Sequence, residues 1–391
     1  MAERPTRPAR RDLGRRPGEP VRQDRRPGPR RRHDRRRRSG AAHRQDGEEV
    51  PRPGHVSLEG GRRAACPPQD RARVRERDAR LSPAGLLYLS RDDVAQLLPP
   101  ISEQLDVVER TYEAVGAGRV ELPPKPGVHP RPDSFIHAMP AYLRDEDVAA
   151  LKWVSGYPAN KAHGLPYISG LVVLNDAETG LPVAVMDGAE ITAARTAAAS
   201  GVCVRRWAQD GWRRAAILGC GEQGRYHARV LAALEPEATI RAYDPHPERI
   251  AALPGRVEAA DDLQAAVDGA EVVVTAAPIV DEPDPRIGPE ALGDHWLVLP
   301  IDFDALVRRE VVEAADVFLV DDVEQFEYYR SLGHFRGWPE PQGSVGETLA
   351  RGDAGNRVAC VNLGIGALDA AFAKQVLDAA RERGVGVELP R

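Results

Sequence analysis

A glycine-rich turn between an apolar stretch and a helical segment most constrains the fold of this chain. Residues 215–218 predict a buried strand, and Gly219-Cys220-Gly221-Glu222-Gln223-Gly224 follows directly. In such a turn the first glycine permits the tight bend, the second lets backbone N–H groups approach a pyrophosphate, and the third lets helix and strand pack closely. The helix N-terminus then faces the anion. The pattern predicts a dinucleotide-binding domain.

A second strand, residues 239–243, ends at Asp244, which lies 20 residues after Gly224. A carboxylate at this spacing can bind both ribose hydroxyls and would repel a 2′-phosphate. The first Arg or Lys after it is Arg249. We therefore predict that NAD is the cofactor, rather than NADP. The predicted cofactor contacts are Gly219, Gly221, Glu222, Gln223, Gly224, Asp244, Thr275 at the end of an apolar run, and Arg195.

The net charge of −5 conceals two unlike parts. Residues 1–80 contain 25 Arg and 12 Asp or Glu, a charge of +13, whereas the remainder carries −18. The first part lacks Phe, Trp, Tyr and Ile, so it cannot bury enough apolar area to offset the entropy of ordering. We predict that residues 1–85 form a disordered Arg-rich tail, interpreted as translated sequence upstream of a true start near Leu86. A basic arm for nucleic acid or an anionic membrane is the alternative interpretation, and the absence of interleaved aromatic residues disfavours it.

Several other classes of protein are disfavoured by missing patterns. The four cysteines form no Cys-x-x-Cys pair, and the histidines show no metal-binding spacing, so neither a disulfide framework nor a metal site is predicted. There is no apolar run of about 18 residues and no signal peptide. We expect a cytoplasmic protein with no membrane association.

The pattern around the glycine turn predicts an α/β fold in two parts. Before the turn, a helix capped by Ser102, strands over 149–154, 168–174 and 181–186, and an Ala-rich helix over 192–208 predict an α+β unit. After it, residues 272–274, 296–299 and 317–320 read as buried parallel strands.

These segments suggest domain boundaries. A Rossmann-type doubly wound parallel sheet is predicted over 209–330 as the NAD-binding domain. An α+β substrate-binding and dimerisation domain is predicted over 86–208 plus 345–391, with a helix at 366–383 and a connecting loop over 331–344. The active cleft is expected between the two, at the carboxyl ends of the parallel strands.

Two basic residues stand out from their surroundings. The chain has four lysines against fifty arginines, and Lys152 lies in an otherwise apolar strand. A lysine in a dry, positive pocket can have its pKa lowered enough to transfer protons, which arginine cannot do. Arg195 is the one charge among the small residues of the helical stretch 191–200, and it should face a carboxylate or a phosphate. A snorkelling Lys152 and an internal salt bridge of Arg195 are the alternatives.

Acidic and aromatic residues complete the candidate set. Asp302 and Asp304 directly follow the predicted strand at 296–299, where a general acid or base would be displayed. Helix capping is the alternative, and it suits Asp304 better. The aromatic-rich segment 324–338 is interpreted mainly as packing against the first domain or a subunit partner.

Over residues 86–385 the chain resembles the ornithine cyclodeaminase/mu-crystallin family. The resemblance rests on Pro123-Pro124-Lys125, Met139-Pro140-Ala141-Tyr142, Leu151-Lys152-Trp153-Val154, Tyr157-Pro158-Ala159-Asn160, residues 176–180, Arg195-Thr196-Ala197-Ala198 and the Gly219 turn. The chain departs from the family pattern at Lys125, Tyr167, Phe303-Asp304-Ala305 and Asn362-Leu363-Gly364.

The resemblance implies a homodimer that binds NAD and a small amino or imino acid. It places the substrate carboxylate on Lys125, Lys152 and Arg195, and the catalytic acid or base on Asp302. The named candidate reaction is conversion of ornithine to proline with release of ammonia. Pyrroline-2-carboxylate reduction or alanine-type dehydrogenation is the alternative, and a mu-crystallin-like NAD(P)-dependent ligand-binding protein is the alternative of another class.

Overall fold

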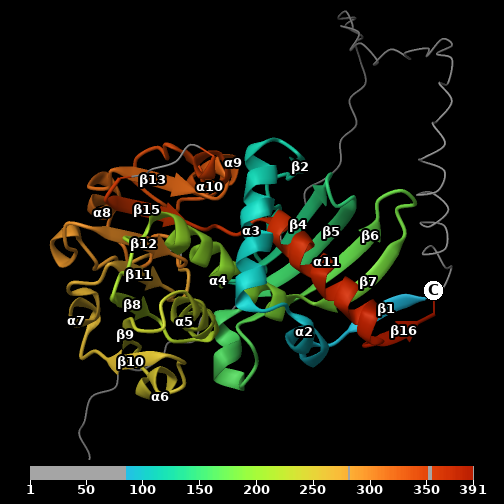
Figure 1. Ribbon diagram of the computed structural model, residues 1–391, viewed down its shortest axis with the longest axis horizontal. Helices are drawn as coiled ribbons and strands as arrows, with labels where there is room; N and C mark the ends of the chain where they lie inside the picture. The colour runs from blue at the N-terminus through green and yellow to red at the C-terminus, as the bar shows by residue number, and fades with distance from the viewer. Residues whose placement is uncertain (1–84, 281, 351–354, 391) are drawn as a thin grey trace, which may run out of the picture. The chain divides into compact units, whose positions relative to one another are not determined.

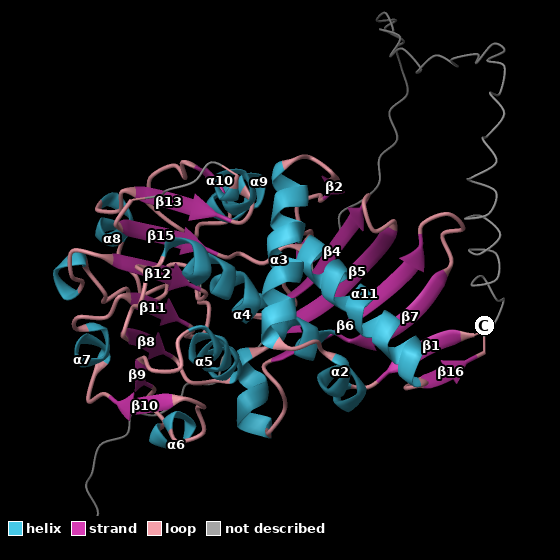
Figure 2. Cartoon of the chain, in the orientation of Figure 1, coloured by secondary structure: helices cyan, strands magenta, loops and turns pink. Residues whose placement is uncertain are grey.

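The computed structural model describes residues 85–280, 282–350 and 355–390. The predicted tail, residues 1–85, lies outside the described residues except for Gly85. The described strands form two sheets, which Figures 1 and 2 show with their helices. None of the helices in these ranges has the length and apolarity needed to cross a bilayer.

The first sheet is mostly antiparallel and has the strand order β16-β1-β7-β6-β5-β4-β2, with β3 paired to β4; only β1 and β7 run parallel. Burial alternates along its long strands because successive side chains point to opposite faces. Its strands are β1 (Leu86–Leu89), β2 (Val120–Glu121), β3 (Gly127–Val128), β4 (Phe135–Leu143), β5 (Val148–Gly156), β6 (Ile168–Asp176), β7 (Pro182–Asp187) and β16 (Val387–Leu389).

Helices cover one face of this sheet. In Figure 1, α11 (Gly366–Arg383) lies across β4, β5 and β6 and packs against α3 (Ile101–Gly116). The predicted cap at Ser102 is wrong: α3 begins at Ile101 after Pro100, so Ser102 lies inside the first turn. The remaining helical segments of this part are α2 (Arg91–Leu97) and the 3-10 helix η1 (Pro158–His163).

The second sheet is entirely parallel, with the order β10-β9-β8-β11-β12-β15-β13-β14. The strand order reverses between β8 and β11, which places a topological switch point there. Its strands are β8 (Arg214–Leu218), β9 (Thr239–Tyr243), β10 (Arg256–Ala259), β11 (Val272–Thr275), β12 (Trp296–Pro300), β13 (Val317–Val320), β14 (Gly343–Ser344) and β15 (Arg357–Val361). The predicted doubly wound parallel sheet is confirmed.

Two predicted boundaries differ from this topology. β14 belongs to the parallel sheet although it falls in the predicted connecting loop 331–344, and β15 lies between β12 and β13 although residues 345–391 were assigned to the other domain. β15 is a central strand, because it pairs with β12 on one side and with β13 on the other, and its apolar residues are buried. The chain returns to the first sheet only with α11 and β16.

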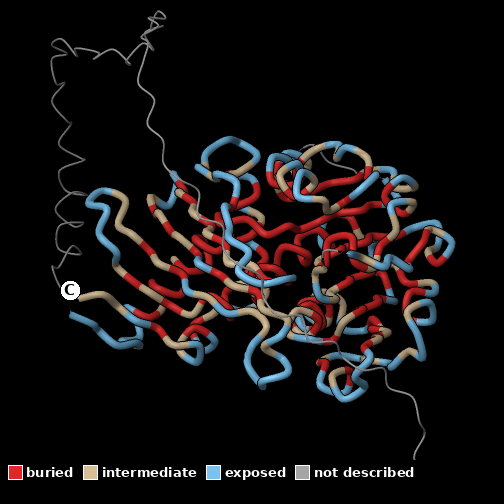
Figure 3. Tube along the Cα trace, turned by 180° about the vertical axis from the view of Figure 1, so that it is seen from behind, coloured by how far each residue is buried: buried red, intermediate tan, exposed pale blue. Residues whose placement is uncertain are grey.

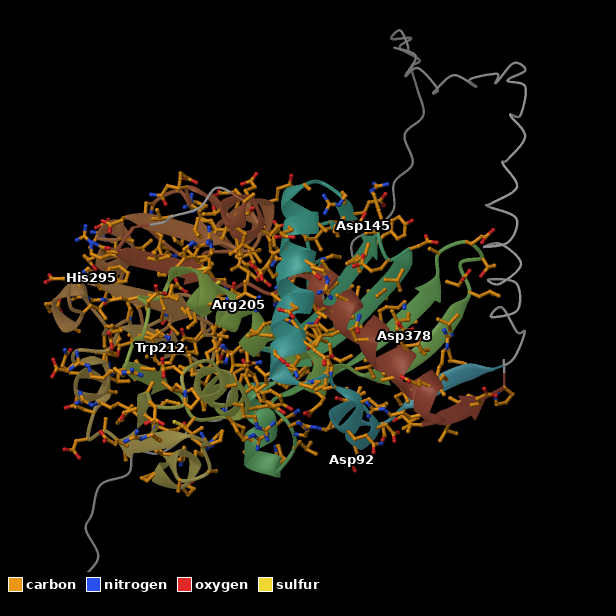
Figure 4. All side chains as sticks on the ribbon, in the orientation of Figure 1. Asp92, Asp145, Arg205, Trp212, His295 and Asp378 are labelled. Atoms are coloured by element: carbon orange, nitrogen blue, oxygen red, sulfur yellow. The ribbon has the colours of Figure 1, made fainter. Side chains whose placement is uncertain are left out.

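The Ala-rich helix α4 (Gly188–Trp207) packs against elements of both parts, including β6, α3 and α5 (Glu222–Leu234). Its small side chains allow this close packing, and nearly all of them are buried. At its exposed end Arg205, labelled in Figure 4, pairs with Asp106 of α3 at 3.0 Å.

Figure 3 shows that buried segments run through both sheets. The other helical segments lie in the connections between the strands of the parallel sheet. They are α6 (Pro247–Ile250), α7 (Leu263–Val267), η2 (Pro289–Ala291), α8 (Arg309–Glu313), α9 (Val323–Ser331) and α10 (Val345–Leu349). Because β8, β11 and β12 are neighbouring parallel strands, their carboxyl ends lie together at one edge of the sheet, where a binding site can form.

Candidate active site

A cavity of about 790 Å³ is lined by residues from both sheets. The part of the chain that contains the antiparallel sheet and α4 contributes the following residues, among others: Lys125, His129, Arg131, Asp133, Phe135, His137, Met139, Lys152, Tyr167, Thr192, Arg195 and Thr196. The part that contains the parallel sheet contributes residues that include Gln223, Ala276, Ala277, Ile279, Ile301, Phe303, Tyr329, His334, Arg336, Asn362 and Leu363. The residues after β8, β11 and β12 line it, as expected for a parallel sheet.

Lys152 enters this cavity from the middle of β5. Its Nζ donates to Asp369 Oδ1 at 2.9 Å and to Thr192 Oγ1 at 3.1 Å, and Asp369 Oδ2 lies 2.8 Å away. Arg195 Nε donates to the same Asp369 Oδ1 at 3.0 Å. A carboxylate of α11 therefore bridges two cations that come from β5 and α4.

The environment of Lys152 alters its protonation. Burial and, to a smaller extent, the nearby Arg195 lower the pKa of Lys152 to about 7, against the opposing effect of Asp369. The predicted internal salt bridge of Arg195 is present, but Arg195 also lines the cavity. When Lys152 is protonated, the two cations and one carboxylate leave one positive charge for an anionic ligand.

Lys125 is brought to the same cavity by the segment between β2 and β3. Its Nζ donates to the carbonyls of Leu363 and Gly364 at 2.8 and 3.2 Å, and it lies 5.0 Å from the centre of the Tyr329 ring. Burial lowers the pKa of Lys125 to about 7, although the nearby Asp321 opposes this effect.

Asp321 supports the same loop from its other side. Its carboxylate, at the end of β13, accepts the backbone N–H groups of Leu363 and Gly364 at 3.0 and 2.7 Å. The peptide after β15 is thus held between Asp321 and Lys125. Lys125 accordingly contributes to the shape of the cavity wall as well as to its charge.

The glycine turn fits a dinucleotide. Gly219 has a φ of +96° and any Cβ would lie 2.5 Å from the Ala276 carbonyl oxygen, while a Cβ on Gly224 would lie 2.2 Å from Gly219 O. At Gly221, by contrast, a Cβ would meet no atom of the described residues within 4 Å apart from its chain neighbours, and α5 begins there without a side-chain cap. The buried Gln223 Oε1 also lacks a hydrogen-bond partner within the described part of the chain. Open backbone at a helix N-terminus is suited to a pyrophosphate.

Two other predicted cofactor contacts are engaged within the protein. Glu222 pairs with Arg91 of α2. Asp244 accepts from the Cys220 N–H and the His246 N–H, both at 2.8 Å, and Arg249 Nη1 lies 3.5 Å from its Oδ1. Asp244 therefore ties the end of β9 to the glycine turn.

Asp302 lies directly behind the cavity wall. It is 1% exposed and does not line the cavity, although Ile301, Phe303 and Ala277 do. Its carboxylate accepts from the Thr275 hydroxyl and from the Ala277 N–H, the latter at 3.0 Å. Burial raises the pKa of Asp302 to about 7, against the effect of these hydrogen bonds. Thr275, predicted as a cofactor contact, is fully buried and bonded to Asp302.

Asp304 has a different partner from the one its spacing suggested. No helix starts at Ala305, and the Asp304 carboxylate accepts the Phe335 N–H at 2.7 Å. It thereby fixes the loop after α9, which contributes His334 and Arg336 to the cavity. The aromatic segment 324–338 packs around Phe326 and Phe335 against residues of the parallel-sheet part, not against the first domain as predicted, and its Tyr329 also lines the site.

Two residues that shape the site, Asp369 and Asp321, were not predicted from the sequence. Asp369 lies among small and apolar residues near the start of α11, the same signal that singled out Arg195. Asp321 directly follows a buried parallel strand, as Asp302 does. Within residues 85–280, 282–350 and 355–390, no group of three or more His, Cys, Asp or Glu side chains could hold a metal ion.

The fold and cavity define a class of protein: a parallel, Rossmann-type nucleotide-binding sheet joined to a second sheet that presents a cation-lined ligand site. The sequence matches the ornithine cyclodeaminase/mu-crystallin family over residues 87–294, and the chain belongs to this family.

Similar proteins agree with this assignment. The chain is 37% identical to the nodulation efficiency protein NfeD of Rhizobium meliloti, over 78% of this chain and 98% of that protein. It is 27% identical to the alanine dehydrogenase of Archaeoglobus fulgidus, again over 78% and 98%. Among solved structures, it resembles the Thermococcus litoralis Δ1-pyrroline-2-carboxylate reductase in complex with NADH and L-proline, at 25% identity and a TM-score of 0.69, over 78% of this chain and all of that one.

Proposed function

We propose that this protein is an NAD-dependent oxidoreductase that transfers hydride at Cα of a small amino or imino acid. The observation that carries the proposal is the convergence of Lys152 and Arg195 with the ends of β8 and β11 on one cavity. Relatives support it: an alanine dehydrogenase, a reductase with bound NADH, and an archaeal alanine dehydrogenase with bound NAD.

The glycine turn would hold the pyrophosphate and Asp244 the adenosine ribose. When bound, NAD supplies the hydride acceptor or, once reduced, the hydride donor. Arg195 would bind the substrate carboxylate, with Lys125 shaping and charging the wall beside it. Lys152, with its pKa near neutrality, would bind the carboxylate and move a proton at the substrate nitrogen.

Cyclodeamination of ornithine is the second candidate, because the family includes ornithine cyclodeaminases. One observation disfavours it: the side-chain ammonium of ornithine would find Asp133 as the single carboxylate among the described lining residues. The curated ornithine cyclodeaminase of Agrobacterium fabrum also matches only 39% of this chain.

One assay separates these functions. The full chain is incubated with NADH and either pyruvate plus ammonia or pyrroline-2-carboxylate, and separately with ornithine and catalytic NAD. Stoichiometric oxidation of NADH supports the oxidoreductase. Formation of proline and ammonia from ornithine, with no net change in NADH, would overturn the oxidoreductase proposal in favour of a cyclodeaminase. Tight ligand binding without turnover would indicate a mu-crystallin-like binding protein.

We also propose that the protein acts as a homodimer through the outer face of its first sheet. Because Lys152 and Val172 face the helices, their neighbours Trp153 and Leu171 point away, and these two register partners are 48% and 44% exposed. The similar archaeal alanine dehydrogenase structure is a dimer. A second copy of the chain would cover this apolar surface.

A further inference from the structure

The charge of the cavity exceeds what one substrate carboxylate requires. Its described lining residues include five lysine or arginine side chains and a single carboxylate, Asp133. Lys125, Lys152 and Arg195 are buried, whereas Arg131 and Arg336 are exposed. The buried group suits the α-carboxylate of an amino acid, so the two exposed arginines are left without a role in that step.

Arg131 and Arg336 also differ from neighbouring arginines in having no acidic partner. Within the described part of the chain, neither guanidinium has a carboxylate oxygen within 4 Å. Each donates a side-chain hydrogen bond to a nearby carbonyl, Arg131 to Pro130 O at 2.6 Å and Arg336 to Gly333 O at 3.0 Å. By contrast, Arg308, Arg309 and Arg330 all pair with glutamates. Two guanidinium groups without counter-ions at one cavity form a ready site for an anion.

The loop that carries Arg131 is fixed by internal hydrogen bonds. The Arg131 N–H donates to Ser134 Oγ at 2.9 Å, and that hydroxyl donates back to the Arg131 carbonyl at 2.7 Å. Ser134 itself is only 3% exposed. The turn is therefore part of the folded structure, which reduces the entropy lost when a ligand binds there.

The loop that carries Arg336 is fixed in a similar way. The buried Asp304 accepts the Phe335 N–H, and its Oδ1 lies 3.6 Å from His334 Nδ1. The side chain of Phe335 is fully buried beside Phe303 and Phe326. Arg336 thus extends from an anchored turn.

Rings, rather than acids, form much of the remaining wall. His137 stacks on Phe135 with 4.4 Å between ring centres and lies 6.5 Å from the Tyr329 ring. Burial and the nearby Lys125 lower the pKa of His137 to about 3, so this ring stays neutral at physiological pH. A substrate ammonium would gain little from such a wall, since Asp133 is its one described acid.

We propose that Arg131 and Arg336 bind a second carboxylate, at the end of the substrate side chain, so that the substrate is a dicarboxylic amino or imino acid. The inference rests on the proposed function, because it specifies the side chain of that substrate. In the reductive direction, a 2-oxo diacid, ammonium, NADH and a proton give the amino diacid, NAD and water. The C=O bond is replaced by C–N and C–H bonds, and the oxygen leaves as water.

The first test is equilibrium binding, which does not depend on turnover. Succinate and butyrate have the same number of carbons and differ by one carboxylate, and each is titrated by calorimetry into the full chain with saturating NAD. Succinate is expected to bind at least about 10-fold more tightly. In the double variant Arg131→Gln/Arg336→Gln this preference is lost, whereas Arg381→Gln, an exposed arginine on α11, keeps it. Equal binding of the two acids by the wild-type chain would overturn the inference.

The second test compares kcat/KM for oxaloacetate and for pyruvate, each with ammonia and NADH. The ratio should favour the diacid by about 10-fold or more, and the double variant should lower this ratio. A ratio that favours pyruvate, or turnover of ornithine alone, would contradict the dicarboxylate inference while leaving an NAD-dependent enzyme. Arginine-dependent succinate binding with no turnover of any amino or oxo acid would instead contradict the proposed function and leave the anion subsite in place.

Discussion

Lys152 Nζ lies 2.8 Å from Asp369 Oδ2, and the two side chains, 217 positions apart, are both almost fully buried. A buried carboxylate shared with Arg195 neutralises only part of the local positive charge. The arrangement holds an amine of lowered pKa in place before any substrate arrives. Such preorganisation is what a proton-transfer group needs.

The first prediction concerns removal of the Lys152 amine. Lys152→Met is expected to lower kcat/KM at least about 100-fold, because both carboxylate binding and proton transfer are lost. Lys161→Met, at an exposed lysine outside the cavity lining, is the matched control and should retain activity. Steady-state kinetics with the best amino or oxo acid checks this, and a Lys152→Met enzyme with full turnover would refute the role of Lys152.

The same variant tests the state of Lys152 through stability. Burial lowers the pKa of Lys152 from 10.5 to about 7. Between these pH values the unfolded chain binds the additional proton, so the free energy of unfolding should rise with pH in this window. Urea unfolding at pH 7 and pH 9.5 should show that the rise is smaller in Lys152→Met. An identical pH dependence in the two proteins would mean that Lys152 is not held in a low-pKa state.

A second prediction uses Asp369, whose carboxylate stabilises the protonated form of Lys152. Replacing it in Asp369→Asn should lower the pKa of Lys152 further. The limb of the kcat/KM profile that reports Lys152 should therefore move to lower pH, by about 1 pH unit or more. Asp378→Asn, at an exposed acid of the same helix, should leave the profile in place. A limb that moves to higher pH would contradict the sign of the interaction.

The sequence was sufficient to find isolated charges but not their partners. Lys152 and Arg195 could be found because each interrupts a run of small or apolar side chains, where a charge needs a counter-ion or a ligand. Asp369 carries the same signal, but an acid in the first turn of a helix is also explained by the helix dipole. That β5, α4 and α11 meet at one carboxylate depends on tertiary packing, which local pattern does not encode.

The same limit explains the placement of β15 and of Arg131. The apolar residues 358–361 predict a buried strand in either domain, and only its pairing with β12 and β13 decides between them. Arg131 is an ordinary arginine of a Pro-rich loop in the sequence. Its place in the cavity depends on how the loop before β4 meets the loop after α9.

A third prediction separates two roles for Asp302. If Asp302 transfers protons, Asp302→Asn should remove a limb of the kcat/KM profile near pH 7, since burial raises the pKa of Asp302 to about 7. If it positions the Ala276-Ala277 segment through the Ala277 N–H, KM for NADH should rise while the profile keeps its shape. Its position behind the wall leads us to expect the second result, with KM raised about 10-fold. Thr275→Val, which removes the other bond to Asp302, should act in the same direction.

A fourth prediction concerns the choice between NAD and NADP. The Asp244 carboxylate would repel a 2′-phosphate, while Arg249, 3.5 Å from it, would attract one. Asp244→Asn keeps an oxygen that can accept the Cys220 N–H and removes the charge. We expect the ratio of kcat/KM for NADPH to that for NADH to rise at least about 10-fold. Addition of Arg249→Gln should reverse much of that gain; an unchanged ratio in Asp244→Asn would show that another residue sets the preference.

The last prediction tests the proposed homodimer through Trp153. Its side chain is 48% exposed on the face of β5 opposite Lys152, beside Leu171 of β6 and Ala138 of β4. A carboxylate there would be desolvated in an interface, which is costly, but would be solvated in a monomer. Trp153→Glu should therefore convert the dimer into a folded monomer in light scattering, whereas Val323→Glu, at a similarly exposed residue of α9, should leave the dimer intact. A wild-type chain that is monomeric at micromolar concentration would show that this sheet face has no second copy as its partner.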